Sequence, residues 1–265
     1  MATLVDHPLS FAFVVLLAFT AATSIGAWLA ARRGGLSSGQ REDFNLVLGA
    51  TMTLLSLIIG FSFSMAISRY DQRKSLEEAE ANAIGTAYVR VELLAEGRAV
   101  EIKRLLQEYT RLRFAFYLAN DEDGLKEVNA RTEGVQEALW AATAAGAKEQ
   151  PTPLSALAAA AVNDVINSQG YTQAAWWNRI PRGAWMLMLA IGFVASTMVG
   201  YSARMAWKEP VVMLMLPLVT SVAIFLIADI DSPRGGMIRL QPQNLTALSN
   251  SFHDPVASAP PAGAR

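Results

Sequence analysis

The chain has 265 residues, of which 52% are hydrophobic and 17% are charged, and 22 basic residues face 23 acidic ones. An average soluble domain carries about 25% charged residues, so this composition disfavours a soluble globular protein, and a net charge of −1 disfavours a nucleic-acid binder. The absence of Cys excludes disulfides and thiolate sites, and the two histidines, His7 and His253, are too few for the usual zinc or His-based catalytic sites.

Four windows without a formal charge, 25, 25, 21 and 19 residues long, dominate the chain. A bilayer core about 30 Å thick needs about 20 apolar residues in a helix, and only a helix satisfies the backbone groups of a single segment in lipid. Four buried helices of a soluble core are the alternative, but soluble helices of this length rarely lack a polar face. The predicted transmembrane helices are 8–31, 44–68, 183–206 and 210–230.

Aromatic and basic residues at the ends of these windows indicate membrane interfaces, as where Trp28 precedes Arg32 and Arg33. A signal peptide is the alternative for the first window, although no basic residues precede it. Seven basic residues lie near the membrane on the side of the termini, and five lie on the other side. The positive-inside rule therefore places both termini and segment 69–180 in the cytoplasm of a multi-pass protein, which we expect in the inner (plasma) membrane.

Segment 69–180 is predicted to be a helical extramembrane domain between spans 2 and 3. Apolar residues recur at spacings of three and four from residue 102 to residue 116, and no strand-like alternation is visible, so the fold class is all-α. The acidic run 121–123 does not have the spacing of an EF-hand loop, and we interpret it as a turn with an N-cap. The Pro- and Ala-rich tail 249–265 is predicted to be disordered.

The second span carries a stripe of small residues at spacings of 3 and 4, which places them on one face of a helix. Such a stripe is typical of tight packing between membrane helices, and it is also suited to lining a pore or a cavity. No Pro or turn signal separates this span from residues 69–94, so one helix is predicted to continue beyond the membrane. The residues of this small-residue stripe are Gly49, Thr53, Ser56, Gly60, Ser64 and Ser68.

Two aromatic residues of the same span are candidates for an apolar constriction that gates by dewetting. Phe61 and Phe63 differ by about 200° around a helix. Only one of the two can therefore face the axis of a pore.

Charged residues continue an apolar seam of the segment that follows. Going backwards from Ile84, the same spacing reaches Glu80, Glu77 and Arg73. Charges on a buried face are costly unless they are paired or hydrated. We interpret them as solvated salt bridges at the membrane surface, and the alternative is an ion-contacting or gating ring in an oligomer.

The end of the fourth span adds further boundary charges. Asp229 and Asp231 close the apolar window, and a carboxylate within the membrane is by default a functional candidate. An ion pair of Asp229 with Arg239 or with Arg69 is at least as good an explanation. Arg69 itself ends the second span.

Two long runs, GFSFSMAISRYDQRKSLEEAEANAIGTAYVR at 60–90 and DIDSPRGGMIRLQPQNL at 229–245, resemble the bestrophin-like domain family. With the four-span layout, the resemblance covers nearly all of the chain except the tail. It implies a four-helix membrane region with a helical domain between spans 2 and 3, and kinship with pentameric anion channels whose second span lines the pore. Animal bestrophins carry an acidic calcium-binding cluster after the last span. Here only two aspartates follow it, which argues against calcium gating.

Two functions are consistent with these features. The first is a homo-oligomeric channel for small inorganic ions, anions such as chloride, with the small-residue stripe of the second span facing the path. The second is a non-conducting membrane scaffold or sensor whose helical domain binds a partner. A membrane enzyme with a carboxylate-only site of Glu77, Glu80 and Asp231 has little support, because no catalytic motif is visible. We expect no catalytic residue, metal or cofactor, and partners limited to lipid, ions and further copies of the chain, with no nucleic acid.

Overall fold

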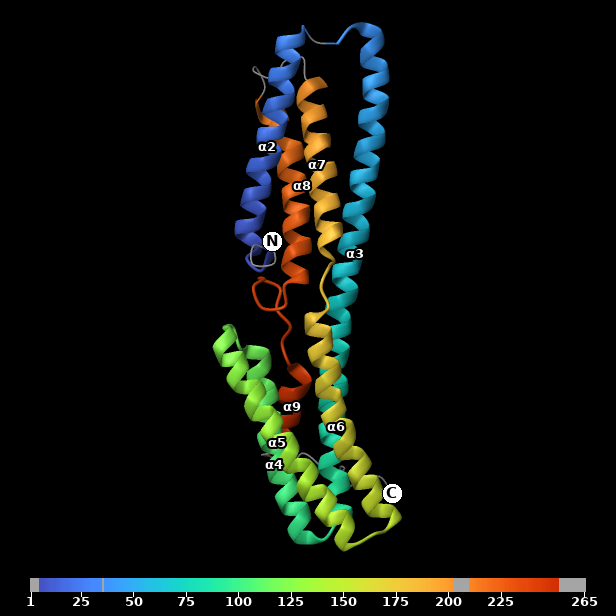
Figure 1. Cartoon of the computed structure of the whole chain (residues 1–265), viewed down its shortest axis with the longest axis vertical. Coiled ribbons are helices and arrows are strands. Elements are labelled where there is room, and N and C mark those ends of the chain that lie inside the picture. The colour runs from blue at the N-terminus through green and yellow to red at the C-terminus, as the bar shows by residue number, and fades with distance from the viewer. Residues whose placement is uncertain (1–4, 35, 203–209, 253–265) are drawn as a thin grey trace, which may run out of the picture. The chain divides into compact units, whose positions relative to one another are not determined.

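The computed structural model describes residues 5–34, 36–202 and 210–252, and every regular element in these ranges is a helix. Figure 1 shows their course along the chain. The elements in order are α2 (Pro8–Arg33), α3 (Ser38–Arg90), a short 3-10 helix η1 (Val91–Leu93), α4 (Glu96–Leu118), α5 (Glu122–Glu149), α6 (Pro153–Trp177), α7 (Arg182–Ser202), α8 (Pro210–Asp231) and α9 (Gln243–Ser251).

The predicted fold class is confirmed: the chain is an all-α membrane protein with four helical stretches long and apolar enough to cross a bilayer. The predicted second span lies within α3, which continues as one helix to Arg90. The predicted third span reaches residue 206, but the structure describes this region only as far as Ser202. Disorder was predicted from residue 249, yet α9 continues to Ser251. Its Leu245 is fully buried, and this packing holds the helix in place. The rest of the predicted tail, from residue 253, lies outside the described residues.

The chain divides into two compact units. Unit 1 comprises residues 1–70 and 179–239, and unit 2 comprises residues 71–178 and 240–265. The division falls inside α3, so the first half of this helix belongs to unit 1 and the second half to unit 2.

Small residues hold the helices of unit 1 together. In Figure 1, α2, α7 and α8 lie side by side. A Cβ atom on Gly26 of α2 would lie 2.0 Å from the carbonyl oxygen of Thr197, and one on Gly200 of α7 would lie 1.9 Å from that of Thr23. Neither position can carry a larger side chain without moving a backbone, so the two glycines let α2 and α7 cross at close range.

Unit 2 is a helical domain whose core is lined by the second half of α3. The apolar seam predicted on residues 102–116 is buried, with Ile102, Tyr109 and Phe116 fully enclosed. The predicted N-cap before α5 is confirmed, because the Asp121 carboxylate accepts the backbone N–H of Gly124 at 2.9 Å. Two local features predicted for this domain, the buried seam of α4 and the N-cap of α5, are therefore present in it.

Candidate functional site

The small-residue stripe of the second span lies on α3 and is called the α3 stripe below; the described residues of the chain leave it exposed. All six of its residues are exposed, and a Cβ atom on Gly49 or Gly60 would meet no other atom within 4 Å. Only 11% of the apolar window of α3 is buried inside the chain, compared with 33–44% for the other three windows. In a single chain this face is therefore open along its length.

The Thr53 hydroxyl of the α3 stripe forms a hydrogen bond within its own helix, so its hydrogen needs no partner from lipid or from another chain. The hydroxyl of Thr53 donates to the carbonyl oxygen of Gly49 at 3.0 Å, one turn earlier, so its hydrogen is satisfied within the helix while its oxygen still points outward. Phe61 and Phe63, the candidate constriction, are 65% and 37% exposed. Both rings are therefore available to line a surface formed with other chains.

A charge cluster in unit 1 brings two of the predicted boundary residues together. The Asp231 carboxylate is 1% exposed and accepts the backbone N–H of Ile180 at 3.1 Å. Arg69 Nη1 lies 3.7 Å from Asp231 Oδ1, and Arg179 Nε lies 3.9 Å from Asp231 Oδ2. Arg179 also pairs with Asp6. This cluster ties the N-terminal segment, α3, the start of α7 and the end of α8 together.

Asp229 has a different role from the one predicted for it. Its two oxygens accept the backbone N–H groups of Met237 at 2.6 Å and Ile238 at 2.8 Å. The predicted ion pair of Asp229 with Arg69 or Arg239 is therefore wrong. Arg69 faces Asp231 instead, and the Asp229 side chain is used to close the loop that follows α8.

A glycine makes this loop closure sterically feasible. A Cβ atom on Gly236 would lie 2.4 Å from the carbonyl oxygen of Asp229. The Nε of Arg239 donates to the carbonyl oxygen of Gly236 at 3.1 Å. The segment DIDSPRGG is thus a compact connection built around one buried carboxylate.

The remaining boundary charges are buried in unit 2, so their interpretation as solvated salt bridges is wrong. Arg73, Glu77 and Glu80 are 2%, 1% and 0% exposed. Arg73 Nε donates to the carbonyl oxygen of Ala175 at 3.4 Å. The helix turns them inward because they share the face of the apolar seam. Arg73 contacts α6, Glu77 contacts α9, and Glu80 contacts both α4 and α6.

Glu77 joins α3 to α9. Its carboxylate accepts the side-chain amide of Asn244 at 2.7 Å and the backbone N–H of Leu245 at 2.9 Å. The second contact satisfies one of the N–H groups at the start of α9, which has no side-chain N-cap of its own. A carboxylate remote in sequence therefore caps this helix.

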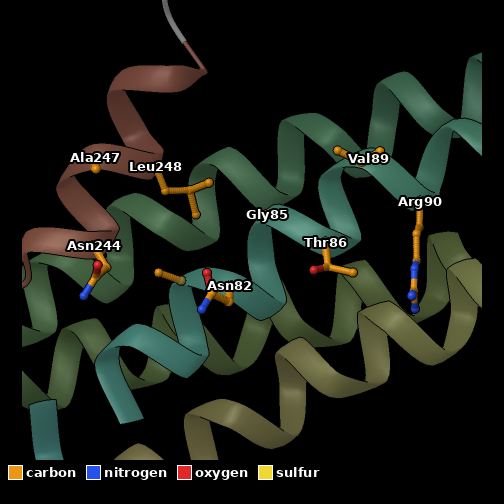
Figure 2. Close-up of a pocket in the computed structure, with 9 residues that line it drawn as sticks. Asn82, Gly85, Thr86, Val89, Arg90, Asn244, Ala247 and Leu248 are labelled. Atoms are coloured by element: carbon orange, nitrogen blue, oxygen red, sulfur yellow. The ribbon is translucent and has the colours of Figure 1, made fainter. Parts of the chain in front are cut away.

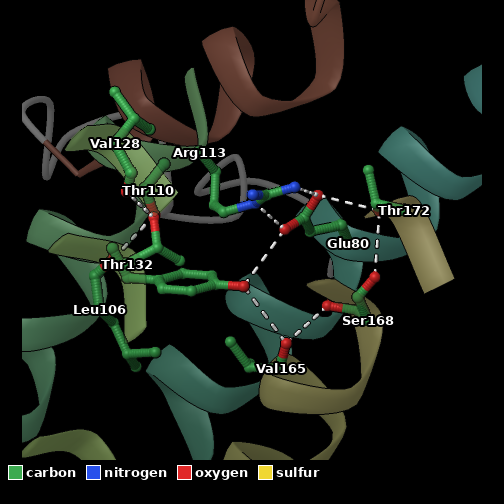
Figure 3. A network of polar contacts seen from close by, with 10 residues as sticks. Glu80, Leu106, Thr110, Arg113, Val128, Thr132, Val165, Ser168 and Thr172 are labelled. Carbon is green, nitrogen blue, oxygen red and sulfur yellow. Dashed lines mark hydrogen bonds and ion pairs between the residues drawn. The ribbon is translucent and has the colours of Figure 1, made fainter. Parts of the chain in front are cut away.

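Glu80 is the centre of a fully buried polar network, shown in Figure 3. Arg113 donates to it through Nε and, at 3.4 Å, through Nη2. The hydroxyls of Tyr109 and Thr172 each donate at 3.2 Å. The network connects α3, α4 and α6 through one carboxylate.

The charges of this network are mutually stabilised. Burial lowers the pKa of Arg113, but the nearby charge of Glu80 and the hydrogen bond to it raise that pKa by more, so the guanidinium stays charged. Burial, reinforced by the charge of Glu80, raises the pKa of Tyr109, so its hydroxyl stays protonated and remains a donor. Both oxygens of Glu80 are thus used within the domain, which leaves little support for a carboxylate-only catalytic site.

Sequence reasoning missed the partners of these charges. Arg113 lies 33 residues and Thr172 lies 92 residues from Glu80 in sequence, yet both contact it in the folded domain. One Arg in a charged helix and one Thr in an Ala-rich helix carry no pattern that predicts such a contact. Within the described ranges, no group of three or more His, Asp or Glu side chains could hold a metal ion.

Comparisons with known proteins agree on one family. A model described as the Bestrophin-like domain matches residues 17–245, and this range includes both runs that carry the resemblance. Two structures of a bacterial bestrophin homologue from Klebsiella pneumoniae, each with a point mutation, are 15% identical. Their TM-scores are 0.63 and 0.65, and the matches cover 91% and 92% of this chain and 100% and 94% of theirs.

A further structure, described as a membrane protein with a point mutation, has a TM-score of 0.66 at 14% identity, and the match covers 92% of this chain and 97% of that one. At this identity the likeness shows a shared fold over nearly the whole chain. No curated protein matches the sequence.

Proposed function

Because the chain belongs to the bestrophin-like family, we propose that it forms a homo-oligomeric ion channel whose path is lined by the α3 stripe. One observation carries the proposal: the residues that the structure describes leave this face of α3 open along its length in a single chain. A ring of copies, a pentamer in the simplest analogy with the family, would enclose it. The structural relatives from Klebsiella pneumoniae are bestrophin homologues, which supports the same assignment.

The chemistry of the stripe fits a conduction path. Small side chains leave room at the axis, and the hydroxyls of Thr53, Ser56 and Ser64 can contact ions without binding them strongly. We propose anions as the conducted species, because the chain belongs to the bestrophin-like family, whose resemblance is to anion channels. Phe61 or Phe63 would form a narrow apolar ring that controls hydration.

The proposed location follows the charge distribution. We place the protein in the inner (plasma) membrane, with both termini and segment 69–180 in the cytoplasm. The excess of basic residues on that side supports this orientation.

The direct test is current through planar bilayers that contain the purified protein, together with its mass in detergent. We expect Ser64→Trp to abolish the current by filling the path. Met65→Trp is the matched control: its side chain is 40% exposed and points about 100° away from that of Ser64, so the current should remain.

Each outcome separates the candidate functions. A monomeric mass without current would overturn the channel proposal. An oligomer that carries no current would instead support the non-conducting scaffold or sensor. A current that Ser64→Trp and Met65→Trp reduce equally would show that the stripe does not line the path.

A further inference from the structure

Helix α6 of unit 2 is unusually poor in charge for an extramembrane helix. It contains one charged residue, Asp164, in 25 residues, whereas α4 has eight in 23 and α5 has nine in 28. Helix faces in contact with water are normally rich in Lys, Arg, Glu and Asp. The composition of α6 therefore points to a covered outer face, although no described residue covers it.

Helix α6 exposes the apolar residues Leu154, Leu157 and Trp177, and it carries one exposed stripe that consists of small and amide side chains apart from Tyr171. Small and amide side chains let a second helix approach closely, because little side-chain volume separates the backbones. We call this set the α6 outer face. Its exposed residues are Ala156, Ala160, Asn163, Asn167, Tyr171 and Ala174.

A groove of about 630 Å³ lies elsewhere in the same unit, between the second half of α3 and α9. Figure 2 shows Asn82, Thr86 and Arg90 along one wall and Ala247 on α9 along the other. The two helices approach each other closely at Gly85, where a Cβ atom would lie 3.3 Å from Leu248 Cδ1. We call it the α3–α9 groove.

The outer face and the groove lie at the same level of the domain. Glu80 of α3 contacts Thr172 of α6, and the Tyr109 hydroxyl lies within reach of both Glu80 and the carbonyl oxygen of Val165. Nearer the membrane, Arg73 reaches the carbonyl oxygen of Ala175. The two helices are thus antiparallel, and the groove-lining part of α3 lies beside the middle of α6.

The outer face and the groove also lie on different sides of α3. Gly85 contacts α9, whereas Glu80 contacts α6. Five residues apart, these positions differ by about 140° around the helix. One chain therefore presents a projecting surface on one side and a receiving surface on another, which is the arrangement that closes a ring through head-to-tail contacts.

We propose that the α6 outer face of one copy docks into the α3–α9 groove of a second copy. The inference rests on the homo-oligomer proposed above and names the surfaces that build it. Charge complementarity supports the choice of partner: Asp164 is the lone charge of α6, and Arg90 is an exposed cation of the groove. In the described part of the chain, neither side chain takes part in an ion pair.

The absence of natural Cys allows a direct test by cross-linking. Two double variants, Asn167→Cys with Ala247→Cys and Asn163→Cys with Thr86→Cys, place one thiol on each surface. Mild oxidation of the full-length protein in detergent should convert the monomer band into a ladder of multimers on a non-reducing gel. Each single variant, and the matched control Asn167→Cys with the exposed Val100→Cys of α4, should keep the monomer band.

The outcomes separate this inference from the channel proposal. If mass measurements show an oligomer but neither double variant gives a ladder, the docking surfaces are wrong and the oligomer stands. If α6 single variants alone form covalent dimers, α6 meets α6 and the head-to-tail contact is wrong. A monomeric mass overturns both proposals together.

Discussion

The two halves of α3 carry the same kind of periodic pattern in opposite environments. In unit 1 the α3 stripe repeats small residues every three or four positions, and every member is exposed. In unit 2 the same spacing selects Arg73, Glu77 and Glu80, and all three are buried. Periodicity identifies a face of a helix, but only the neighbouring helices decide whether that face is covered.

The difference also reverses the expected polarity of the two faces. The small and hydroxyl residues, which look suited to helix packing, are left exposed by the described part of the chain. The charged residues, which look suited to water, are enclosed by α4, α6 and α9. Burying a charge is costly unless it is paired and hydrogen-bonded, and the number of partners around Glu80 shows how this domain meets that cost.

The largest expected effect is therefore the loss of the Glu80 carboxylate. Glu80→Ala leaves the guanidinium of Arg113 buried without its partner, which costs about 3–5 kcal/mol of stability. Thermal unfolding of the purified protein, followed by circular dichroism, measures the change. Glu78→Ala removes an exposed carboxylate of the same helix and should leave the unfolding temperature nearly unchanged.

Equal effects of the two substitutions would contradict the buried network. The double variant Glu80→Gln, Arg113→Met sharpens the test, because it removes both charges at nearly constant volume. It should recover much of the loss caused by Glu80→Ala.

Covered and uncovered glycines in unit 1 give the second comparison. Gly200 touches the backbone of α2, whereas Gly60 of the stripe has open space around it. Gly200→Ala should cost about 1–3 kcal/mol, since the new Cβ forces α2 and α7 apart. Gly60→Ala should be neutral or slightly stabilising in monomers, by up to about 1 kcal/mol, because Ala favours a helix.

Unfolding of both variants under the same detergent conditions measures the contrast. If Gly60→Ala lowers stability in monomers as much as Gly200→Ala, the stripe is covered within the chain and the proposed path loses its basis. A cost of Gly60→Ala that appears only in the oligomer would place the stripe at a contact between copies.

The sequence predicted the parts of this fold that depend on composition and local pattern. Long uncharged windows specify membrane helices, and the run at Asp121 specifies an N-cap, because both act within a few residues. The partners of Glu77 and Glu80 could not be predicted, since Asn244 and Arg113 are brought near them only by the tertiary fold. The pairing of Asp229 failed for a related reason. The Asp229 oxygens accept hydrogen bonds from backbone N–H groups of the following loop, and a sequence does not show the direction of such groups.

The smallest expected effect concerns an exposed ion pair, which contrasts with the buried pair of Glu80. Hydrogen bonds from Arg98, at 2.7 and 3.1 Å, lower the pKa of the Glu149 carboxyl below its ordinary value of 4.5. A lowered folded-state pKa means that the pair contributes stability above the unfolded-state pKa and loses it as the pH falls through the folded-state value. Glu149→Gln should therefore lower the unfolding temperature slightly at about pH 7, and this difference should shrink as the pH falls through the folded-state pKa.

Salt is the second variable of this experiment, because water and ions surround both side chains. The small difference at about pH 7 should disappear at an ionic strength of about 1 M, where exposed charges are screened within about 3 Å. The effect of Glu80→Ala should persist there, since no salt reaches its network. Glu137→Gln, at another exposed carboxylate of α5, is the control for a general charge effect. If the effect of Glu149→Gln survives high salt or grows on acidification, the difference in burial does not explain why the Arg98–Glu149 pair and the Arg113–Glu80 pair contribute differently to stability.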